Sequence, residues 1–419
     1  MNAVEQAVAD AHRREWGLVL AATVRVARDL DLAEECVQEA YVAALTAWER
    51  DSIPRNPAAW LTTTAKRRAM DAIRREQAFK SKLPLLIEPD EEVEEMEEME
   101  PVLEDPEGVV PDERLRLIFT CCHPALAQEA QVALTLRLVC GVSTADIAKA
   151  FLVSETTMAA RMTRAKKKIS TARIPYRVPA AAELPDRLRG VLGVIHLLFT
   201  TGHTAPSGAE LVRSELVDRS LHLSRVLRDL MPDEREVWGL LALLLVTDAR
   251  RATRSGADGR LLRLEEQDRS QWDRDAIAEA HELIVAGLRA GNPGRYVLQA
   301  AIASLYAEAP SYHETDWAQI VQLYDALLRV WPSPVVALNR TVPLAMVAGP
   351  EAALSELELL EAEPQLAGYR YLPAVKADLL RRLGRTEEAV EAYREALALT
   401  DNEAEREFLT GRIADPGRP

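Results

Sequence analysis

The chain has 419 residues, a formal net charge of −15 and only 5% aromatic residues. This length predicts about two to four domains and excludes a peptide or a disulfide-stapled miniprotein. Its four cysteines, two of them adjacent, favour reduced thiols over a disulfide framework. The apolar runs fall short of the ~20 residues that a bilayer-spanning helix needs, and the N-terminus lacks a signal-peptide core. We therefore expect a cytoplasmic protein without a membrane contact, and the abundant Ala, Leu, Glu and Arg favour an all-α, multidomain fold.

The negative charge is concentrated in one segment. Twelve acids and no bases lie between Glu88 and Glu107. Two other stretches are basic, because residues 66–82 hold seven Lys or Arg against two acids, and residues 155–177 hold seven against one. Separated basic patches of this kind can contact nucleic acid even on an acidic protein.

Residues 5–80 have the pattern of a bundle of amphipathic helices. Apolar residues recur at spacings of three and four from Leu18 to Trp48, and a break with two prolines follows at residues 50–57. A further helix then restarts, with an apolar stripe at Leu61, Ala65, Ala69 and Ile73. This arrangement leaves four basic side chains to reach solvent or phosphate: Lys66, Arg67, Arg74 and Arg75.

The segment 81–111 combines prolines with acids and is too charged to fold alone, so it is predicted to be a linker. Fully extended, its residues from 83 onward could span about 95 Å.

Residues 112–175 carry the spacing of a helix-turn-helix. Ser143 and Ser154 are the N-cap candidates of its two helices, and a short break lies at 152–154. The second helix has an apolar stripe, at Met158, Met162, Ala165 and Ile169. Its opposite face is small and neutral at the start and basic at the end, which suits a helix that enters the major groove and then follows phosphates.

Two further helical regions are expected beyond residue 180, at 183–300 and 301–412. In the second of them Ile320, Leu354 and Ala389 recur at steps of 34 and 35 residues. This is the tetratricopeptide (TPR) period, so a TPR-like domain is predicted there.

At this point the sequence resembles a known family. "DLAEECVQEAYVAALTAW" and "AWLTTTAKRRAMDAIRRE" are similar to region 2 of bacterial sigma factors, and "VSTADIAKAFLVSETTMAARMTRAKKKI" is similar to region 4. With its long C-terminal extension, the chain resembles the extracytoplasmic-function (ECF) sigma factors of the sigma-70 family. The resemblance implies a protein that binds core RNA polymerase, recognises the minus-35 and minus-ten promoter elements and initiates transcription, with activity controlled by the fused C-terminal domain.

The resemblance also implies which residues do this. The polymerase clamp would be met by an acidic helix with Asp31, Glu34, Glu35, Gln38 and Glu39. The minus-ten element would be met by Arg55, Asn56, Trp60, Lys66, Arg67, Arg74 and Arg75. The minus-35 element would be read by Thr156, Thr157, Ala160, Arg161, Arg164 and Lys167.

Other readings of the sequence remain open. One is a helix-turn-helix regulator that binds DNA without polymerase, and another is a TPR scaffold whose basic helices are incidental. No enzyme motif is present, so no catalytic residue and no cofactor is predicted. Cys121, Cys122 and His123 could offer metal ligands, but their spacing favours core cysteines and no metal site. A TPR-like domain usually holds a protein or peptide, which is a further expected partner.

Overall fold

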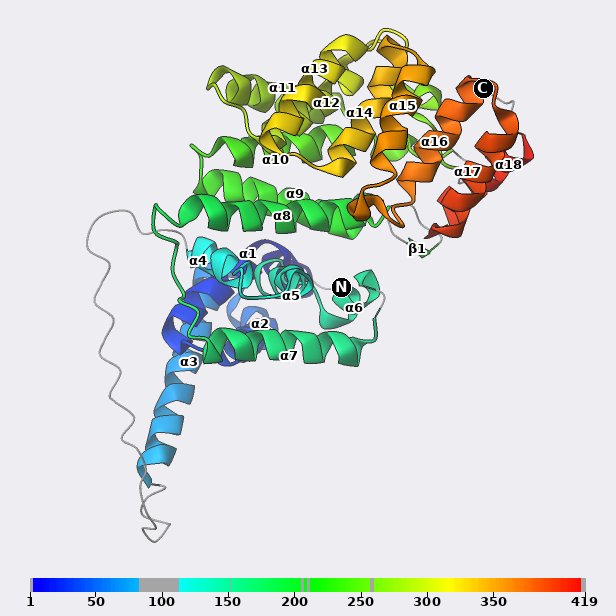
Figure 1. Ribbon diagram of the computed structural model, residues 1–419. Helices are drawn as coiled ribbons and strands as arrows, with labels where there is room; N and C mark the ends of the chain where they lie inside the picture. Colours follow the sequence, from blue (N-terminus) through cyan, green and yellow to red (C-terminus); the bar gives the residue numbers. More distant parts are fainter. Residues whose placement is uncertain are drawn as a thin grey trace. The chain divides into compact units, whose positions relative to one another are not determined.

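The structure is a computed structural model that describes residues 3–82, 113–151, 153–204, 207–208, 212–256 and 260–415 (Figure 1). The predicted all-α fold is confirmed. Strands in the described residues are limited to β1 (Ser207–Gly208) and β2 (Asp401–Asn402), which pair in parallel. The chain divides into two compact units, Met1–Val194 and Ile195–Pro419. Most of the predicted acidic linker, from residue 83 to residue 111, lies outside the described residues.

The first unit begins with three helices that pack on one another, α1 (Ala3–Ala27), α2 (Leu30–Asp51) and α3 (Pro57–Lys82). The Asp29 carboxylate caps α2 by accepting a hydrogen bond from the Leu32 N–H at 2.8 Å. The break predicted around residues 50–57 is found between α2 and α3. The apolar stripe of α3 is confirmed for three residues, all fully buried: Leu61, Ala65 and Ala69.

The second helical group of this unit follows the undescribed segment. It consists of α4 (Glu113–Cys121), α5 (Gln128–Leu134), the π-helical turn η2 (Thr135–Val139), α6 (Thr144–Ala150) and α7 (Glu155–Thr171). Both predicted caps are confirmed, because the Ser143 hydroxyl accepts from the Asp146 N–H and the Ser154 hydroxyl accepts from the Thr157 N–H. Helices α6 and α7 pack together as the two halves of the predicted helix-turn-helix.

The two helical groups of the first unit pack closely through α1. A Cβ atom added at Gly17 would lie 2.5 Å from the backbone oxygen of Val139, so only glycine lets α1 approach η2 this closely. Next to it, the buried Trp16 ring lies 5.9 Å from the guanidinium carbon of Arg137. Farther along α1, the Tyr176 hydroxyl donates to the Ala21 backbone oxygen at 2.9 Å. These contacts join the group of α1–α3 to the group of α4–α7.

The second unit is built from helices around α10. Its first part contains the end of α8 (Leu184–His203), α9 (Ser214–Leu230), α10 (Arg235–Asp248), α11 (Arg274–Arg289) and α12 (Arg295–Glu308). Three short 3-10 turns lie between α10 and α11, at η3 (Arg251–Thr253), η4 (Leu264–Glu266) and η5 (Arg269–Gln271). Apolar residues of α10, α11 and α12 form one buried cluster around Trp272.

The C-terminal helices follow in antiparallel pairs. They are α13 (Trp317–Val330), α14 (Pro334–Val347), α15 (Pro350–Leu360), α16 (Tyr371–Arg382), α17 (Thr386–Ala398) and α18 (Glu403–Ala414), with the 3-10 turn η6 (Pro364–Leu366) before α16. The residues that set the predicted period are buried on the first helix of each pair: Ile320, Leu354 and Ala389. The boundary predicted at residue 300 falls inside α12, which packs on both α10 and α13.

Replacing Gly17 by Ala is expected to lower the free energy of unfolding by about 1–3 kcal/mol, because the added methyl group overlaps the Val139 backbone oxygen. Gly190→Ala is the matched control in the same unit. Its Cβ would make only an ordinary 3.7 Å contact, so better helix propensity should raise stability by up to ~1 kcal/mol. Urea unfolding of both variants measures the difference, and equal effects would contradict the close approach of α1 to η2.

Candidate polymerase-binding and DNA-binding surfaces

The second helix of the helix-turn-helix, α7, turns one face inward. Its predicted apolar stripe is confirmed, since all four residues are buried: Met158, Met162, Ala165 and Ile169. The cap at Ser154 leaves the first turn of α7 open to solvent, with both neighbouring threonine hydroxyls hydrogen-bonded to the Ser154 hydroxyl. The exposed face carries five of the six residues expected at the minus-35 element: Thr156, Thr157, Ala160, Arg164 and Lys167.

The sixth of these residues, Arg161, is partly withdrawn from solvent. Its guanidinium forms an ion pair with the Glu129 carboxylate at 2.9 Å, and its side chain is 25% exposed. Glu129 belongs to α5, so a DNA contact by Arg161 requires this ion pair to break. Arg164 is exposed, and its Nε atom donates to the Ala160 backbone oxygen of its own helix at 3.2 Å. Arg164 is therefore the more available of the two arginines.

The loop between α2 and α3 presents residues expected at the minus-ten element. Arg55 and Asn56 are exposed. The Asn56 side chain also caps α3, because its oxygen accepts a hydrogen bond from the Ala59 N–H at 3.0 Å. Trp60 is half-buried, with its ring edge-on to that of Trp48 at a centroid distance of 5.7 Å. The loop thus presents an exposed cation, and the first turn of α3 that follows it presents a half-buried aromatic ring.

Basic side chains continue along α3. Arg67, Arg74 and Arg75 are exposed and Lys66 is half-buried. Asp71 lies among them, with its carboxylate 4.0 Å from the Arg74 guanidinium and its backbone oxygen accepting from the Arg75 Nε. The bases outnumber this acid, so the surface of α3 suits a phosphate backbone.

The acidic helix α2 is partly available to a partner. Four of its five candidate residues are exposed: Asp31, Glu35, Gln38 and Glu39. Glu39 forms an ion pair with Arg68 of α3. Glu35 has no ion pair within the described residues and extends into solvent.

Glu34, the fifth candidate, is buried. Its carboxylate forms ion pairs with Arg137 of η2 and with the Lys166 Nζ of α7, the latter at 2.8 Å. The same Nζ atom lies 2.6 Å from the Asp31 carboxylate. The sequence alone suggests an exposed docking residue here, but Glu34 is only 7% exposed, because η2 and α7 lie against α2. We call Asp31, Glu34, Arg137 and Lys166 the interregion ion cluster.

Nothing in the sequence indicates that Arg137 and Lys166 belong to this cluster. Lys166 lies neither in the apolar stripe of α7 nor on its opposite face, and its partner Glu34 is 132 residues away. Burial disfavours the charged form of Lys166, but the carboxylates of Glu34 and Asp31 outweigh burial and hold the pKa of Lys166 above its usual value. The lysine is therefore positively charged at neutral pH, and the ion cluster is formed.

The cysteines lie in the core. Cys36, Cys121, Cys122 and Cys140 are all buried. Burial raises the pKa of Cys122 to about 11, so its thiol is protonated at neutral pH. No group of three or more His, Cys, Asp or Glu side chains in the described residues could hold a metal ion. None of the described helices is long and apolar enough to cross a membrane.

Comparison with known proteins assigns the helical groups of the first unit. Residues 11–79 match sigma-70 region 2, residues 116–169 match sigma-70 region 4, and residues 187–287 match a family of unknown function (DUF6596). An uncharacterised protein of Rhizobium meliloti (strain 1021) is 43% identical over 392 residues, which cover 93% of this chain and 91% of that protein. The ECF RNA polymerase sigma factor SigK of Mycobacterium ulcerans (strain Agy99) is 46% identical over 66 residues, 16% of this chain and 33% of that protein. No solved structure matches.

A helical region 2 followed by a helix-turn-helix region 4 defines a sigma factor, a transcription initiation protein that takes part in promoter recognition. The chain belongs to the extracytoplasmic-function group of the sigma-70 family, and it carries a helical C-terminal extension.

Replacing Glu34 by Gln is expected to lower the free energy of unfolding of the first unit by about 3 kcal/mol, because two half-buried cations lose the buried carboxylate that they share. Glu35→Gln, the adjacent and exposed position, is the control, and its effect should stay within about 0.5 kcal/mol. Urea unfolding of the two variants measures this. A Glu34→Gln variant as stable as the control would show that the ion cluster adds nothing to the packing.

Proposed function

We propose that this sigma factor binds core RNA polymerase through the exposed acids of α2 and reads a two-part promoter with α7 and with the α2–α3 loop. One observation carries the proposal: three chemically distinct exposed surfaces lie on the matched regions, one acidic and two basic. Such surfaces suit a partner that is partly protein and partly nucleic acid.

The exposed face of α7 has the chemistry of a major-groove helix. Its first turns present threonine hydroxyls and a small alanine, which let a helix approach base edges closely. Farther along, Arg164 can donate two hydrogen bonds to one guanine, and Lys167 can meet a phosphate. We propose that Arg164 reads a base of the minus-35 element and that Arg161 joins it after leaving Glu129.

The α2–α3 loop has the chemistry needed for a melted strand. Arg55 and the bases of α3 can neutralise phosphates, and the exposed part of Trp60 offers a face on which an unstacked base can rest. We propose that this loop holds a flipped base of the minus-ten element, at the cost of unstacking that base from its neighbours.

The packed arrangement of regions 2 and 4 occupies part of the proposed docking helix. Asp31 and Glu34 of α2 are held by Lys166 of α7, and Glu34 also by Arg137 of η2. A polymerase that binds the acids of α2 would compete with these cations for the same carboxylates. We therefore propose that this packed arrangement is a closed state, and that polymerase and promoter binding requires region 4 to separate from region 2.

We also propose that the helical C-terminal region controls this activity through a protein or peptide partner. The series of antiparallel helix pairs from α13 to α18 supports this proposal, because stacked pairs of this type form extended binding surfaces. Run-off transcription by the full chain and by a chain ending near residue 180 distinguishes an inhibitory extension from a required one. Equal activity of the two chains would contradict control by the extension.

Glu35→Lys is expected to reduce run-off transcription with core RNA polymerase at least about tenfold, because charge reversal in a charge-matched interface costs well over 1.4 kcal/mol. Glu282→Lys makes the same charge change on the exposed surface of α11 and should leave transcription unchanged. A normal level of transcript from Glu35→Lys would contradict polymerase docking through α2. If that variant still bound the same DNA, a DNA regulator that acts without polymerase would be favoured instead.

Arg164→Ala is expected to weaken holoenzyme binding to a promoter selected from random DNA by about 1–3 kcal/mol. On the same DNA with a scrambled minus-35 element the loss should be small. Lys167→Ala is the contrasting variant, because a phosphate contact should weaken binding to both DNAs alike. Fluorescence anisotropy at fixed salt measures these affinities, and an equal loss on both DNAs for Arg164→Ala would exclude base reading by this residue.

Lys166→Ala is expected to raise run-off transcription when core polymerase is limiting, because it removes the cation that joins α7 to both Asp31 and Glu34. Lys168→Ala removes an equal charge from an exposed position of α7 and should bring no gain. Circular dichroism of both variants checks that the helices persist. Less transcript from a folded Lys166→Ala variant than from the wild type would contradict a closed state held by this lysine.

A further inference from the structure

The second unit contains a cavity of about 640 Å³. Its walls come from the end of α8, from α10 and from the residues around the start of α16, which are distant in the sequence. Four threonines line it, Thr200, Thr201, Thr204 and Thr247, and no described lining residue has a carboxylate. The volume is that of a site for a small organic molecule. The hydroxyls of Thr200 and Thr201 already donate to the Leu197 backbone oxygen, so Thr204 and Thr247 are the threonines that can donate to a ligand.

Arg254 lies directly behind this wall. Its Nη1 atom donates to the backbone oxygen of His203, and its Nη2 atom donates to the Thr204 hydroxyl at 3.1 Å. No carboxylate of the described residues forms an ion pair with it. Burial and, next, the charge of Arg250 lower the pKa of Arg254 to about 10, so the guanidinium is charged at neutral pH. It is a mostly buried cation. The charges of Glu405 and Asp248 favour it, but neither carboxylate forms an ion pair with it.

Arg250 is in the same situation one turn earlier in the chain. Its guanidinium carbon lies 6.0 Å from the centroid of the Trp272 ring, and it makes no hydrogen bond or ion pair to the described residues. The adjacent Arg251 differs, because it is paired with Asp248 at 2.7 Å and with Asp218 at 2.8 Å. Arg251 is thus neutralised by two carboxylates, whereas Arg250 beside it forms no ion pair with the part of the chain that the structure describes.

His203 supplies a neutral donor at the same place. Burial and then the charges of Arg254 and Arg250 lower the pKa of His203 to about 3, and the nearby Thr247 carbonyl only partly opposes this. The ring is therefore neutral, and its Nδ1 atom, 3.2 Å from the Arg254 Nη1, is the acceptor. The proton must then sit on Nε2. That atom is buried, in a residue that is only 8% exposed, and its contact with the Thr247 carbonyl falls short of a well-formed hydrogen bond.

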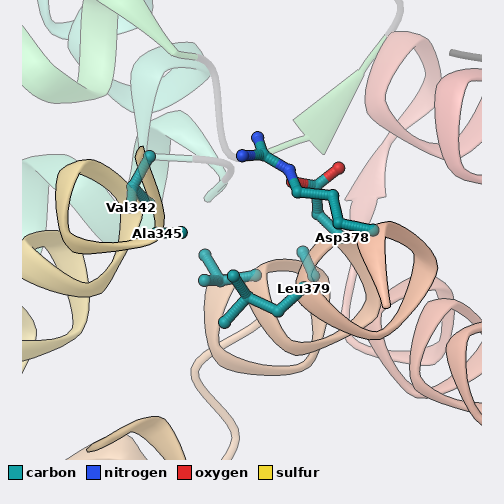
Figure 2. A pocket seen from close by; sticks show the side chains of 7 residues that line it. Val342, Ala345, Asp378 and Leu379 are labelled. Atoms are coloured by element: carbon teal, nitrogen blue, oxygen red, sulfur yellow. The ribbon is translucent and has the colours of Figure 1, made fainter. Parts of the chain in front are cut away.

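A smaller cavity in the same unit provides a contrast. It has a volume of about 180 Å³ and lies between α14 and α16, with Val342 and Leu379 among its lining residues (Figure 2). The arginine beside it, Arg382, forms an ion pair with Asp378 at 2.7 Å. The lining of that cavity is mostly apolar, and the charge of Arg382 is already neutralised by Asp378. The smaller cavity therefore has no unpaired charge that a ligand would compensate.

We propose that the larger cavity is a binding site for a small organic oxyanion, whose carboxylate or phosphate oxygens are held by His203, by the hydroxyls of Thr204 and Thr247 and by the charges of Arg250 and Arg254. Buried cations and a buried donor without a well-formed hydrogen bond are costly, and an oxyanion compensates all of them at once. His203, Arg250 and Arg254 lie within the residues that match the family of unknown function, whereas the wall around Tyr371 lies beyond them. The site does not depend on the proposed promoter recognition.

The test is thermal unfolding of the full chain in inorganic phosphate and, separately, in citrate, each compared with chloride at equal ionic strength. At least one oxyanion is expected to raise the unfolding temperature saturably, and Arg254→Met should remove this rise. In chloride, Arg250→Met should raise the unfolding temperature, because it removes an uncompensated buried charge. Arg251→Met, the matched neighbour, should lower it, because two carboxylates lose their partner.

Three results would overturn the proposal. The first is the absence of a saturable rise in either oxyanion for the wild-type chain, which decides the matter even if a variant fails to fold. The second is a rise that persists in Arg254→Met, since the anion would then bind elsewhere. The third is an Arg250→Met variant that loses as much stability as Arg251→Met, because Arg250 would then be an ordinary structural residue.

Discussion

The first unit depends on one buried carboxylate. Glu34 receives Arg137 from η2 and Lys166 from α7, and Lys166 also reaches Asp31. Burial of this carboxylate is tolerated only while both helical groups stay together, because Arg137 and Lys166 both belong to the second group and together compensate its charge. The close contact of α1 with η2 at Gly17 also holds the two helical groups together. Region 2 and region 4 are therefore packed against each other through residues of α2, the helix for which we propose polymerase docking. In that proposal, docking is linked to the separation of the two regions.

The same rule of charge compensation distinguishes the two units. In the first unit Glu34, Arg137 and Lys166 have partners of opposite sign within the chain. In the second unit Arg250 and Arg254 have none among the described residues, although Arg251 beside them has two. A compensated cluster stabilises a packed arrangement, whereas an uncompensated one next to a cavity favours a bound anion. The first unit thus contains an ion cluster where two regions meet. The second unit contains two arginines, Arg250 and Arg254, without an ion pair among the described residues.

Local periodicity was enough to predict much of the fold. The stripe of Met158, Met162, Ala165 and Ile169 is buried as its spacing requires, and Ser143 and Ser154 cap the helices that they precede. The features that were not predictable depend on tertiary contacts. Nothing near Lys166 in the sequence indicates that it meets Glu34, and the cavity combines residues near His203 with residues near Tyr371. A pattern read along one helix gives the buried face of that helix, but it does not give its partner.

The central claim is that regions 2 and 4 are packed in the free protein and separate when it acts. Its most direct test is the distance between fluorophores on introduced cysteines at Val42 of α2 and Lys168 of α7, measured by energy transfer. Both positions are exposed, and the four native cysteines are buried, so labelling is selective. The account predicts efficient transfer in the free chain and a loss of transfer once core RNA polymerase and promoter DNA are added. Transfer that stays constant while transcript is made would contradict it.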